Sequence, residues 1–313
     1  MTHLDAWLEP QAWTRDSTTP CIALGPEGAF DDMHLFAPCV SLEDGEYRLY
    51  YSGSRGDVRG RVFRLGLATS RDGVAFERSD TSPLFEVGDG SHSVLTPSLL
   101  RGPEGRVARD DQDLRLWYAS TDFPHLSGRH TLHQTSSSDG LHWGPPSPAQ
   151  LEAAYAPSVL YLEDEYRLWY IDVTADPWCV RHARSRDGRA WDVDDLPVLV
   201  LDQAWEHQRL FYPTVLAVEG GFVLYYGSYQ SADPQKTALG VAVSRDGLAW
   251  RKSPNNPVFG PEASHDWESH YTTSQTVMRL PDGSWRMWYA TRPAPPFAHK
   301  YYAIGTAHWA GPE

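Results

Sequence analysis

Arg48-Leu49-Tyr50-Tyr51 is the first of five copies of one phrase, in which Leu or Met precedes two aromatic residues. Successive copies start between 52 and 67 residues apart. The other four copies are Arg115-Leu116-Trp117-Tyr118, Arg167-Leu168-Trp169-Tyr170, Val223-Leu224-Tyr225-Tyr226 and Arg286-Met287-Trp288-Tyr289. Regular recurrence of an apolar phrase is typical of proteins built from repeated structural units.

Two further phrases accompany these copies. Four copies are followed by a Ser-Xaa-Asp-Gly phrase, at Ser70–Gly73, Ser137–Gly140, Ser185–Gly188 and Ser244–Gly247, and the fifth decays into Ile304–Trp309. Asp-Gly steps form tight hairpin turns, because Gly accepts a positive φ and Asp hydrogen-bonds within its own turn. Each copy is also preceded by a strand opening, at Ala37-Pro38, Thr96-Pro97, Ala156-Pro157, Tyr212-Pro213 and, without Pro, Thr273-Ser274.

The repeated unit therefore reads as four strands joined by a turn, a loop and an Asp-Gly turn. Five such units predict an all-β protein, a five-bladed β-propeller with four antiparallel strands per blade. No linker or change of composition divides the chain, so we expect one domain over residues 1–313. Residues before about Asp31 are expected to add the outer strand of the last blade or to close the ring.

Composition supports this fold and narrows the partners. The chain has 13 Trp and 16 Tyr beside 25 Gly and 24 Pro, as expected for many short strands and turns. Its net charge of −14 opposes binding to nucleic acid and to anionic membranes. Met1–Pro10 lacks the apolar core of a secretion signal, and no apolar run reaches the ~18 residues of a membrane span. We expect a soluble, cytoplasmic protein.

The three cysteines, Cys21, Cys39 and Cys179, are odd in number and widely spaced. This spacing opposes a thiolate zinc site or a disulfide framework. We expect three small buried side chains.

One combination of phrases resembles the five-bladed propeller glycosidases, the superfamily of glycoside hydrolase families 43, 32, 68, 117 and 130. It consists of Gly28-Ala29-Phe30-Asp31, a Pro-containing strand, Tyr47–Tyr51, and Gly66–Gly73. The resemblance implies a small carbohydrate as substrate and a pocket on the propeller axis. It also implies carboxylates carried by the inner strands of different blades.

The chain departs from this family at one position of the repeated unit, in all five copies. In family 43-like enzymes the catalytic Asp directly precedes the Pro of an inner strand, whereas the corresponding residues here are Ala37, Thr96, Ala156, Tyr212 and Thr273. The usual acidic triad is therefore not carried over. This leaves open a non-hydrolytic or substrate-binding role.

Acidic residues do occur in the loops that lead into the inner strands. An aromatic residue followed by an acid lies eight and seven residues before Pro at Phe30-Asp31 and Trp205-Glu206, and seven and six before Ser274 at Trp267-Glu268. Glycosidic cleavage needs one protonated and one ionised carboxyl group. We expect Asp31 or Asp32 to face Glu206 or Glu268, with Glu206 as the acid because nearby aromatic residues lower the local polarity. The alternative is that each acid only anchors its loop.

Four histidines precede the inner strands of four blades: His34, His92, His207 and His270. Their arrangement around a common axis suggests an axial metal ion, the one cofactor that the sequence indicates. The alternatives are hydrogen bonds to sugar hydroxyls or a catalytic histidine. Loops between the second and third strands add further polar residues, among them Asp57, Asp122, His125, His130 and His133.

Aromatic residues in loops can stack on a sugar ring, and those in the repeated phrases are expected in the core. The loop candidates are Phe123, Trp178, Tyr229, Phe297 and Tyr301, and Arg292 begins a stiff Pro-rich segment that could form a wall of the pocket.

The leading hypothesis is a glycoside hydrolase-like enzyme that acts on a small oligosaccharide by carboxylate acid/base chemistry. The alternatives are a propeller lyase, isomerase or oxygenase with a His-bound metal, or a catalytically silent carbohydrate-binding propeller. The sequence leaves the sugar and the oligomeric state open.

Overall fold

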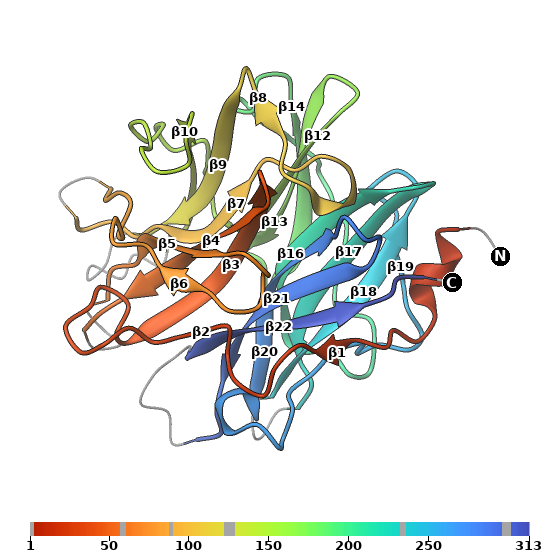
Figure 1. Cartoon of the computed structure of the whole chain (residues 1–313). Helices are drawn as coiled ribbons and strands as arrows, with labels where there is room; N and C mark the ends of the chain where they lie inside the picture. The colour runs from red at the N-terminus through yellow and green to blue at the C-terminus, as the bar shows by residue number, and fades with distance from the viewer. Residues whose placement is uncertain are drawn as a thin grey trace.

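The computed structural model describes residues 3–56, 61–87, 90–121, 129–231, 236–295 and 302–312. These residues form five antiparallel sheets arranged around a central axis, which confirms the five-bladed propeller (Figure 1). The described helices are three short 3₁₀ turns, η1 (Asp5–Leu8), η2 (Pro103–Gly105) and η3 (Asp266–Glu268). None of the described helices is long and apolar enough to cross a membrane.

The first two blades each run outward from an inner strand. Blade one contains β3 (His34–Glu43), β4 (Glu46–Ser54), β5 (Arg64–Ser70) and β6 (Glu77–Arg78). Blade two contains β7 (Leu95–Leu99), β9 (Asp113–Ser120), β10 (Thr131–Ser137) and β11 (Leu151–Glu152), and β8 (Arg109–Asp110) also pairs with β9.

Blades three and four repeat the same order. Blade three contains β12 (Ala154–Leu162), β13 (Glu165–Asp172), β14 (Cys179–Ser185) and β15 (Asp192–Val193). Blade four contains β16 (His207–Val218), β17 (Gly221–Tyr229), β18 (Thr237–Ser244) and β19 (Arg251–Lys252).

Blade five is completed by the N-terminal segment, as predicted. It contains β20 (Tyr271–Arg279), β21 (Trp285–Arg292) and β22 (Ala303–Trp309). Both β1 (Thr14–Arg15) and β2 (Ile22–Ala23) pair antiparallel with β22. Because the first and last parts of the chain share one sheet, the ring is closed by backbone hydrogen bonds.

Every inner strand contains the same irregularity at the centre of the ring. Its register shifts by a bulge where one residue takes a left-handed conformation, with φ between 43° and 55°. These residues are Ala37, Thr96, Ala156, Tyr212 and Ser274. The fifth bulge corrects the sequence alignment, since Ser274 takes the place before Pro that we assigned to Thr273, and Gln275 takes the place of Pro.

The repeated phrases latch neighbouring blades together. An Arg of the second strand donates to the carbonyl of the Asp in the next blade's Asp-Gly turn. The aromatic residue two positions later donates to the carbonyl of the Gly, and we call this pair of hydrogen bonds the latch. In blade three, Arg167 Nη1 lies 3.1 Å from Asp246 O, and Trp169 Nε1 lies 2.8 Å from Gly247 O. Equivalent pairs join Arg48 and Tyr50 to Asp139 and Gly140, Arg115 and Trp117 to Asp187 and Gly188, and Arg286 and Trp288 to Asp72 and Gly73.

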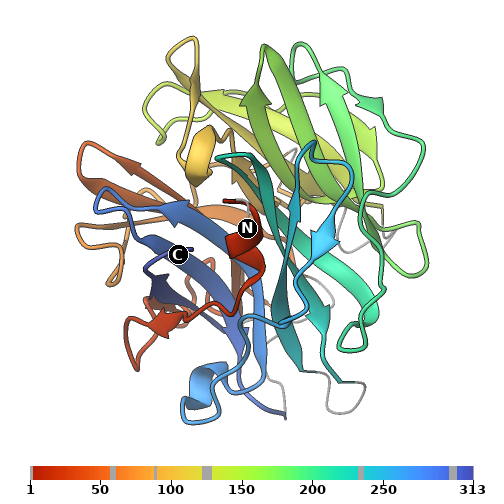
Figure 2. The same cartoon turned by 90° about the vertical axis from the view of Figure 1, so that its right-hand side faces the viewer.

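The seam between blades four and five is the exception, because Val223 replaces the Arg and blade five lacks the Ser-Xaa-Asp-Gly phrase. The N-terminal segment fills this seam, with η1 lying between the two sheets in Figure 2. The ring centroid of Trp7 lies 4.8 Å from that of Trp285, and Trp7 shares a buried cluster with Val223. The hydroxyl of Tyr225 also donates to Gln11 Oε1 at 2.8 Å.

All three cysteines are buried free thiols, as the sequence predicted. The aromatic residues of the five repeated phrases are also buried, at 0 to 6 % exposure. They form the contacts within and between blades, so few of them remain available to a ligand.

Replacing a latch arginine should loosen the ring. Arg115 is buried and donates to Asp110, to the hydroxyl of Tyr166 and to Asp187 O. We expect Arg115→Met to lower the free energy of unfolding by about 3 kcal/mol, because a buried guanidinium loses three hydrogen bonds, one of them to the buried hydroxyl of Tyr166. Urea denaturation would measure this. The exposed Arg245→Met control should change it by less than ~0.5 kcal/mol, and equal effects of the two substitutions would contradict the latch.

Candidate ligand site on the propeller axis

The cavity that could hold a ligand lies on the axis, at the ends of the inner strands that precede the bulges. Its volume is about 230 Å³. Residues from all five blades line it: Phe36, Arg61, Phe63, Leu95, His130, Tyr155, Trp178, Arg209, Phe211, Tyr212, Tyr229, Thr237, Tyr271, Thr273 and Arg292. The bulges explain this convergence, because the residue before each left-handed position faces the cavity, namely Phe36, Leu95, Tyr155, Phe211 and Thr273.

Eight of the lining residues form a continuous aromatic belt: Phe36, Phe63, Tyr155, Trp178, Phe211, Tyr212, Tyr229 and Tyr271. Successive ring centroids along the belt lie between 5.1 and 6.3 Å apart. The hydroxyls of Tyr155 and Tyr212 are hydrogen-bonded to each other at 2.9 Å. The belt therefore gives the cavity rigid apolar faces with polar edges.

Three arginines are set against this belt. The guanidinium carbon of Arg292 lies 3.7 Å from the ring centroid of Tyr271, and that of Arg209 lies 4.4 Å from Trp178. The guanidinium carbon of Arg61 lies 5.7 Å from the ring centroid of Phe63. Such cation–π contacts hold a guanidinium against an aromatic face. The described lining contains no Asp or Glu.

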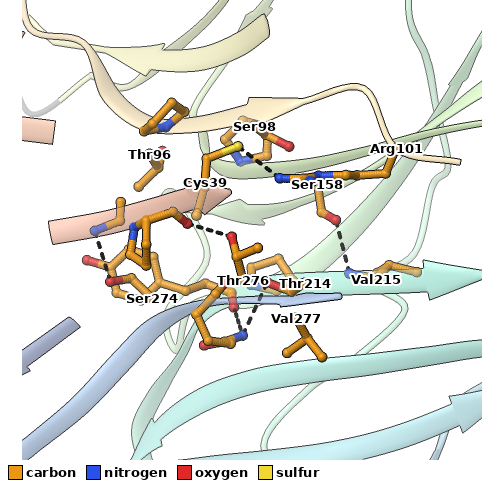
Figure 3. A pocket seen from close by; sticks show the side chains of 18 of the residues that line it. Cys39, Thr96, Ser98, Arg101, Ser158, Thr214, Val215, Ser274, Thr276 and Val277 are labelled. Atoms are coloured by element: carbon orange, nitrogen blue, oxygen red, sulfur yellow. Dashed lines mark hydrogen bonds between the residues drawn. The ribbon is translucent and has the colours of Figure 1, made fainter. Parts of the chain in front are cut away.

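A second, narrower space of about 50 Å³ continues the axis beyond the bulges (Figure 3). It is lined by the bulge residues and those that follow them, and Gly105 of η2 reaches it. Arg101 crosses its wall and donates to Val40 O at 2.6 Å. The backbones of η2 and β20 approach each other closely here, since a Cβ on Gly105 would lie 2.3 Å from Val277 O. This channel is too small for a sugar, so the wider cavity is the candidate site.

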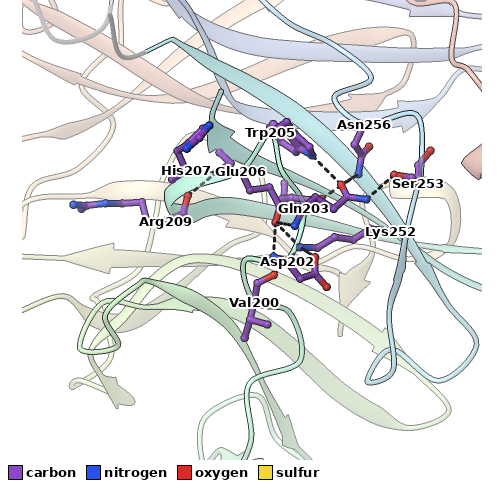
Figure 4. A network of polar contacts seen from close by, with 12 residues as sticks. Val200, Asp202, Gln203, Trp205, Glu206, His207, Arg209, Lys252, Ser253 and Asn256 are labelled. Atoms are coloured by element: carbon purple, nitrogen blue, oxygen red, sulfur yellow. Dashed lines mark hydrogen bonds and ion pairs between the residues drawn. The ribbon is translucent and has the colours of Figure 1, made fainter. Parts of the chain in front are cut away.

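Glu206 does not lie on the wall of the cavity, contrary to our expectation. Its side chain is fully buried inside blade four and accepts hydrogen bonds from the backbone of Asp202 and Gln203 and from the hydroxyl of Tyr226 (Figure 4). Lys252 Nζ lies 2.8 Å from its Oε2. Both carboxylate oxygens are thus engaged within the blade, which favours the loop-anchor interpretation.

Asp31 and Glu268 occupy equivalent positions. Asp31 is fully buried, accepts from Tyr51 at 2.9 Å and pairs with Arg78 at 2.8 Å. Glu268 is also fully buried and accepts from Tyr289 and Arg15, each at 2.9 Å, and from His265 at 2.6 Å. In all three blades, then, a tyrosine of the second strand and a cation of the outer strand hold the acid. Burial, and then the neighbouring carboxylate, raises the pKa of the three tyrosines, which remain neutral donors.

The aromatic residue before each acid explains why the motif recurs. The ring of this aromatic residue packs against a glycine of the third strand of the same blade. The pairs are Phe30 with Gly66, Trp205 with Gly240 and Trp267 with Gly305, and a Cβ on each glycine would lie 2.7 Å from the ring. With Gln275 in the place of Pro, the spacing of this motif is eight and seven residues in all three blades.

Asp32 likewise acts in its own loop, where its Oδ2 accepts from the backbone N–H of Gly28 at 2.8 Å. None of the four predicted catalytic acids is among the described lining of the cavity. The expected pairing of Asp31 or Asp32 with Glu206 or Glu268 across the funnel is not formed. Asp31, Glu206 and Glu268 instead bind partners inside three separate blades.

The four predicted histidines do not converge. His34 and His270 are buried, with His34 6.0 Å from the ring of Phe63 and His270 stacked 5.8 Å from that of Tyr271, while His92 is exposed and His207 half-buried. Burial, followed by the charges of Arg292 and Lys236, lowers the pKa of His270. In the described parts of the chain, no three His, Cys, Asp or Glu residues are grouped so that they could hold a metal ion. The shared axial metal site is therefore not supported.

Arg292, Tyr229 and Trp178 do line the cavity. Asp57, Asp122, Phe123, His125, Phe297 and Tyr301 lie outside the described residues. Sequence reasoning missed Arg61, Phe63, Arg209 and Tyr271 as lining residues. Arg209 and Tyr271 could have been found, since Tyr271 lies two residues before Thr273 and Arg209 two before Phe211, on the same face of the strand.

No protein-family model matches the chain. An uncharacterized Mycobacterium tuberculosis protein, Rv1502 in strain H37Rv and MT1551 in strain CDC 1551, is 26% identical over 243 residues, which cover 72% of this chain and 76% of that protein.

Among solved structures, a candidate glycoside hydrolase of Parabacteroides distasonis superimposes with a TM-score of 0.76 at 16% identity, over 98% of both chains. A structure from glycoside hydrolase family 130 gives 0.74 at 16% identity, over 97% of this chain and 95% of the other. An N-acetylgalactosamine deacetylase from F. plautii, in complex with blood group B trisaccharide, gives 0.70 at 16% identity, over 96% and 94%. These likenesses establish a shared five-bladed propeller fold.

If Glu206 is an anchor, Glu206→Gln should destabilise the protein. The substitution leaves Lys252, whose side chain is 4% exposed, without its buried counter-charge. We expect a loss of about 3 kcal/mol in the free energy of unfolding. In a double-mutant cycle, Glu206→Gln combined with Lys252→Met should cost less than the sum of the two single changes.

Asp202→Asn provides the matched control, because Asp202 also pairs with Lys252 but its side chain is 62% exposed. We expect this control to lower stability by less than ~1 kcal/mol. An unchanged melting curve for Glu206→Gln would rule out the anchor role.

Proposed function

We propose that this chain is a glycoside-processing propeller protein that binds one sugar unit of a small glycoside in the axial cavity. The observation that carries the proposal is the aromatic belt around a 230 Å³ cavity on the axis. Sugar rings present C–H faces that stack on aromatic rings, and their hydroxyls bond to polar edges such as those of Tyr155 and Tyr212. The cavity is smaller than the ~300 Å³ at which sites for drug-sized ligands begin, which favours a single sugar unit.

The comparisons support this proposal at the level of substrate class. Of the structures with the same fold, one is described as a candidate glycoside hydrolase. The family 130 structure is reported with mannoside phosphorylases and with hydrolases that target β-1,2 mannosidic linkages in Candida mannan. The deacetylase structure contains a bound trisaccharide. Fold likeness alone does not transfer an activity, so the cavity itself carries the argument.

For the chemistry, we assign proton transfer to His130. It is the histidine among the described lining residues, and histidine is the side chain whose ordinary pKa lies near neutrality. Its ring centroid lies 4.5 Å from that of Tyr155. Asp31, Glu206 and Glu268 are bound within their blades, so we do not assign them this role.

Binding should depend on the belt. We expect Trp178→Ala to weaken the binding of a confirmed glycoside about 10-fold, since loss of one stacking face removes roughly 1–1.5 kcal/mol. Isothermal titration calorimetry would measure the affinity. Tyr161→Ala is the control, because Tyr161 is exposed and lies outside the described lining. Equal affinity in both variants would place the sugar elsewhere.

Turnover should depend on His130. On a glycoside turned over by the wild type, we expect His130→Gln to lower kcat by at least ~10²-fold, the usual contribution of a general acid or base. The melting temperature should change little, because His130 is only half-buried. His92→Gln, at an exposed histidine outside the described lining, should retain wild-type kcat. Full activity of His130→Gln would limit His130 to a wall residue.

A further inference from the structure

The described lining of the axial cavity is opposite in charge to the whole chain. The protein has a net charge of −14, but the ionic side chains in the described lining are the three arginines, Arg61, Arg209 and Arg292. They come from three places in the ring: the segment before β5, the inner strand β16 and the end of β21. The cavity thus gathers cations from blades one, four and five.

These arginines are placed where their charge acts strongly. Arg61 and Arg292 are buried, at 9% and 8% exposure, and Arg209 is half-buried. Each lies against a ring of the aromatic belt. An apolar surrounding of this kind weakens screening by water and strengthens the attraction between a guanidinium and an anion. Each guanidinium also carries five N–H donors in a planar fork, so it can serve several acceptors at once.

A further cation, Lys236, lies close to the cavity, since it directly precedes the lining residue Thr237. Lys236 and Arg292 both lower the pKa of the buried His270, after the larger effect of burial. A neutral sugar requires none of this charge, since hydroxyls bond equally well to neutral amides and hydroxyls. A carboxylate, sulfate or phosphate group requires it, because its negative charge must otherwise overcome the field of an acidic protein.

We infer that the axial cavity recognises an acidic sugar, one that carries an oxyanion group covalently attached to its ring. This inference rests on the proposed carbohydrate function and narrows it to a substrate class. The aromatic belt contacts the ring of the sugar, and Arg209 and Arg292 bind its oxyanion by charge-assisted hydrogen bonds. Uronic acids and sugar phosphates share this chemistry, and the choice between them is made by the experiment.

The test compares matched pairs of ligands by calorimetry: glucose with glucuronate, galactose with galacturonate, and glucose with glucose 6-phosphate. Inorganic phosphate and sulfate are titrated alone. We expect the acidic member of at least one pair to bind at least ~10-fold more tightly than its neutral partner, with a preference that falls as salt rises. The pair that shows the preference identifies the oxyanion as carboxylate or phosphate.

Two variants test the arginines. Arg209→Gln should weaken the binding of the acidic sugar by about 10- to 100-fold, the value of a charged hydrogen bond, and should leave the neutral partner nearly unaffected. Arg209→Lys should retain part of the preference, because it keeps the charge but loses the fork. Arg245→Gln should behave as wild type, because Arg245 follows β18 at the end opposite to the cavity-lining Thr237.

The possible failures are distinguishable. If neutral sugars bind as tightly as acidic ones, the acidic-sugar inference is overturned and the proposed carbohydrate function stands. If inorganic phosphate or sulfate alone binds as tightly as the acidic sugar, the cavity is a simple anion site and the inference is again overturned. If neither member of any pair binds, the carbohydrate function itself fails. Melting curves of each variant separate loss of binding from loss of fold.

Discussion

The hydrogen bonds from the second strand of one blade to the Asp-Gly turn of the next are the interaction on which this propeller depends. A blade has an apolar surface on each side and cannot bury both without neighbours. The latch supplies the specific part of that packing, because an Arg and a Trp or Tyr satisfy two turn carbonyls that strand pairing leaves unused. Where the latch is missing, between blades four and five, Trp7 and Gln11 from the N-terminal segment make the substitute contacts.

The latch at the periphery and the bulges at the centre together determine where ligand-binding side chains can lie. Closing the ring brings five inner strands to one axis, and each left-handed residue turns the residue before it toward the cavity. A left-handed conformation is uncommon for residues other than Gly and costs about 1–2 kcal/mol. Its repetition in five blades indicates that the surrounding sheets impose it. In this chain the residue before the bulge is Phe, Leu, Tyr, Phe or Thr, so the wall is largely aromatic.

The acids illustrate how one sequence feature supports two opposed interpretations. Asp31, Glu206 and Glu268 follow aromatic residues in loops that lead to the axis, and this placement equally suits catalysis and structural anchoring. The outer strands decide between them. Arg78, Lys252 and Arg15 lie on the fourth strands of their blades and reach inward to the carboxylates, which draws the acids away from the axis. The same arrangement keeps Asp31, Glu206 and Glu268 out of the described lining of the cavity, whose ionic side chains are arginines.

The sequence by itself determined the number of blades, the strand order, the Asp-Gly turns and the closure by the N-terminal segment. These features depend on local periodicity and turn chemistry, which repeat within each copy and can be counted. It also identified Arg292, Tyr229 and Trp178 as residues of the pocket. Tertiary structure alone decided that the acids are engaged inside their blades and that the four histidines do not converge. Partners such as Glu206 and Lys252, or Glu268 and Arg15, are separated by 46 and 253 positions, and nothing local in the sequence relates them. Which side of a loop faces the axis depends on the bulge geometry, because a shift of one residue moves a side chain from the cavity to the interior of the blade.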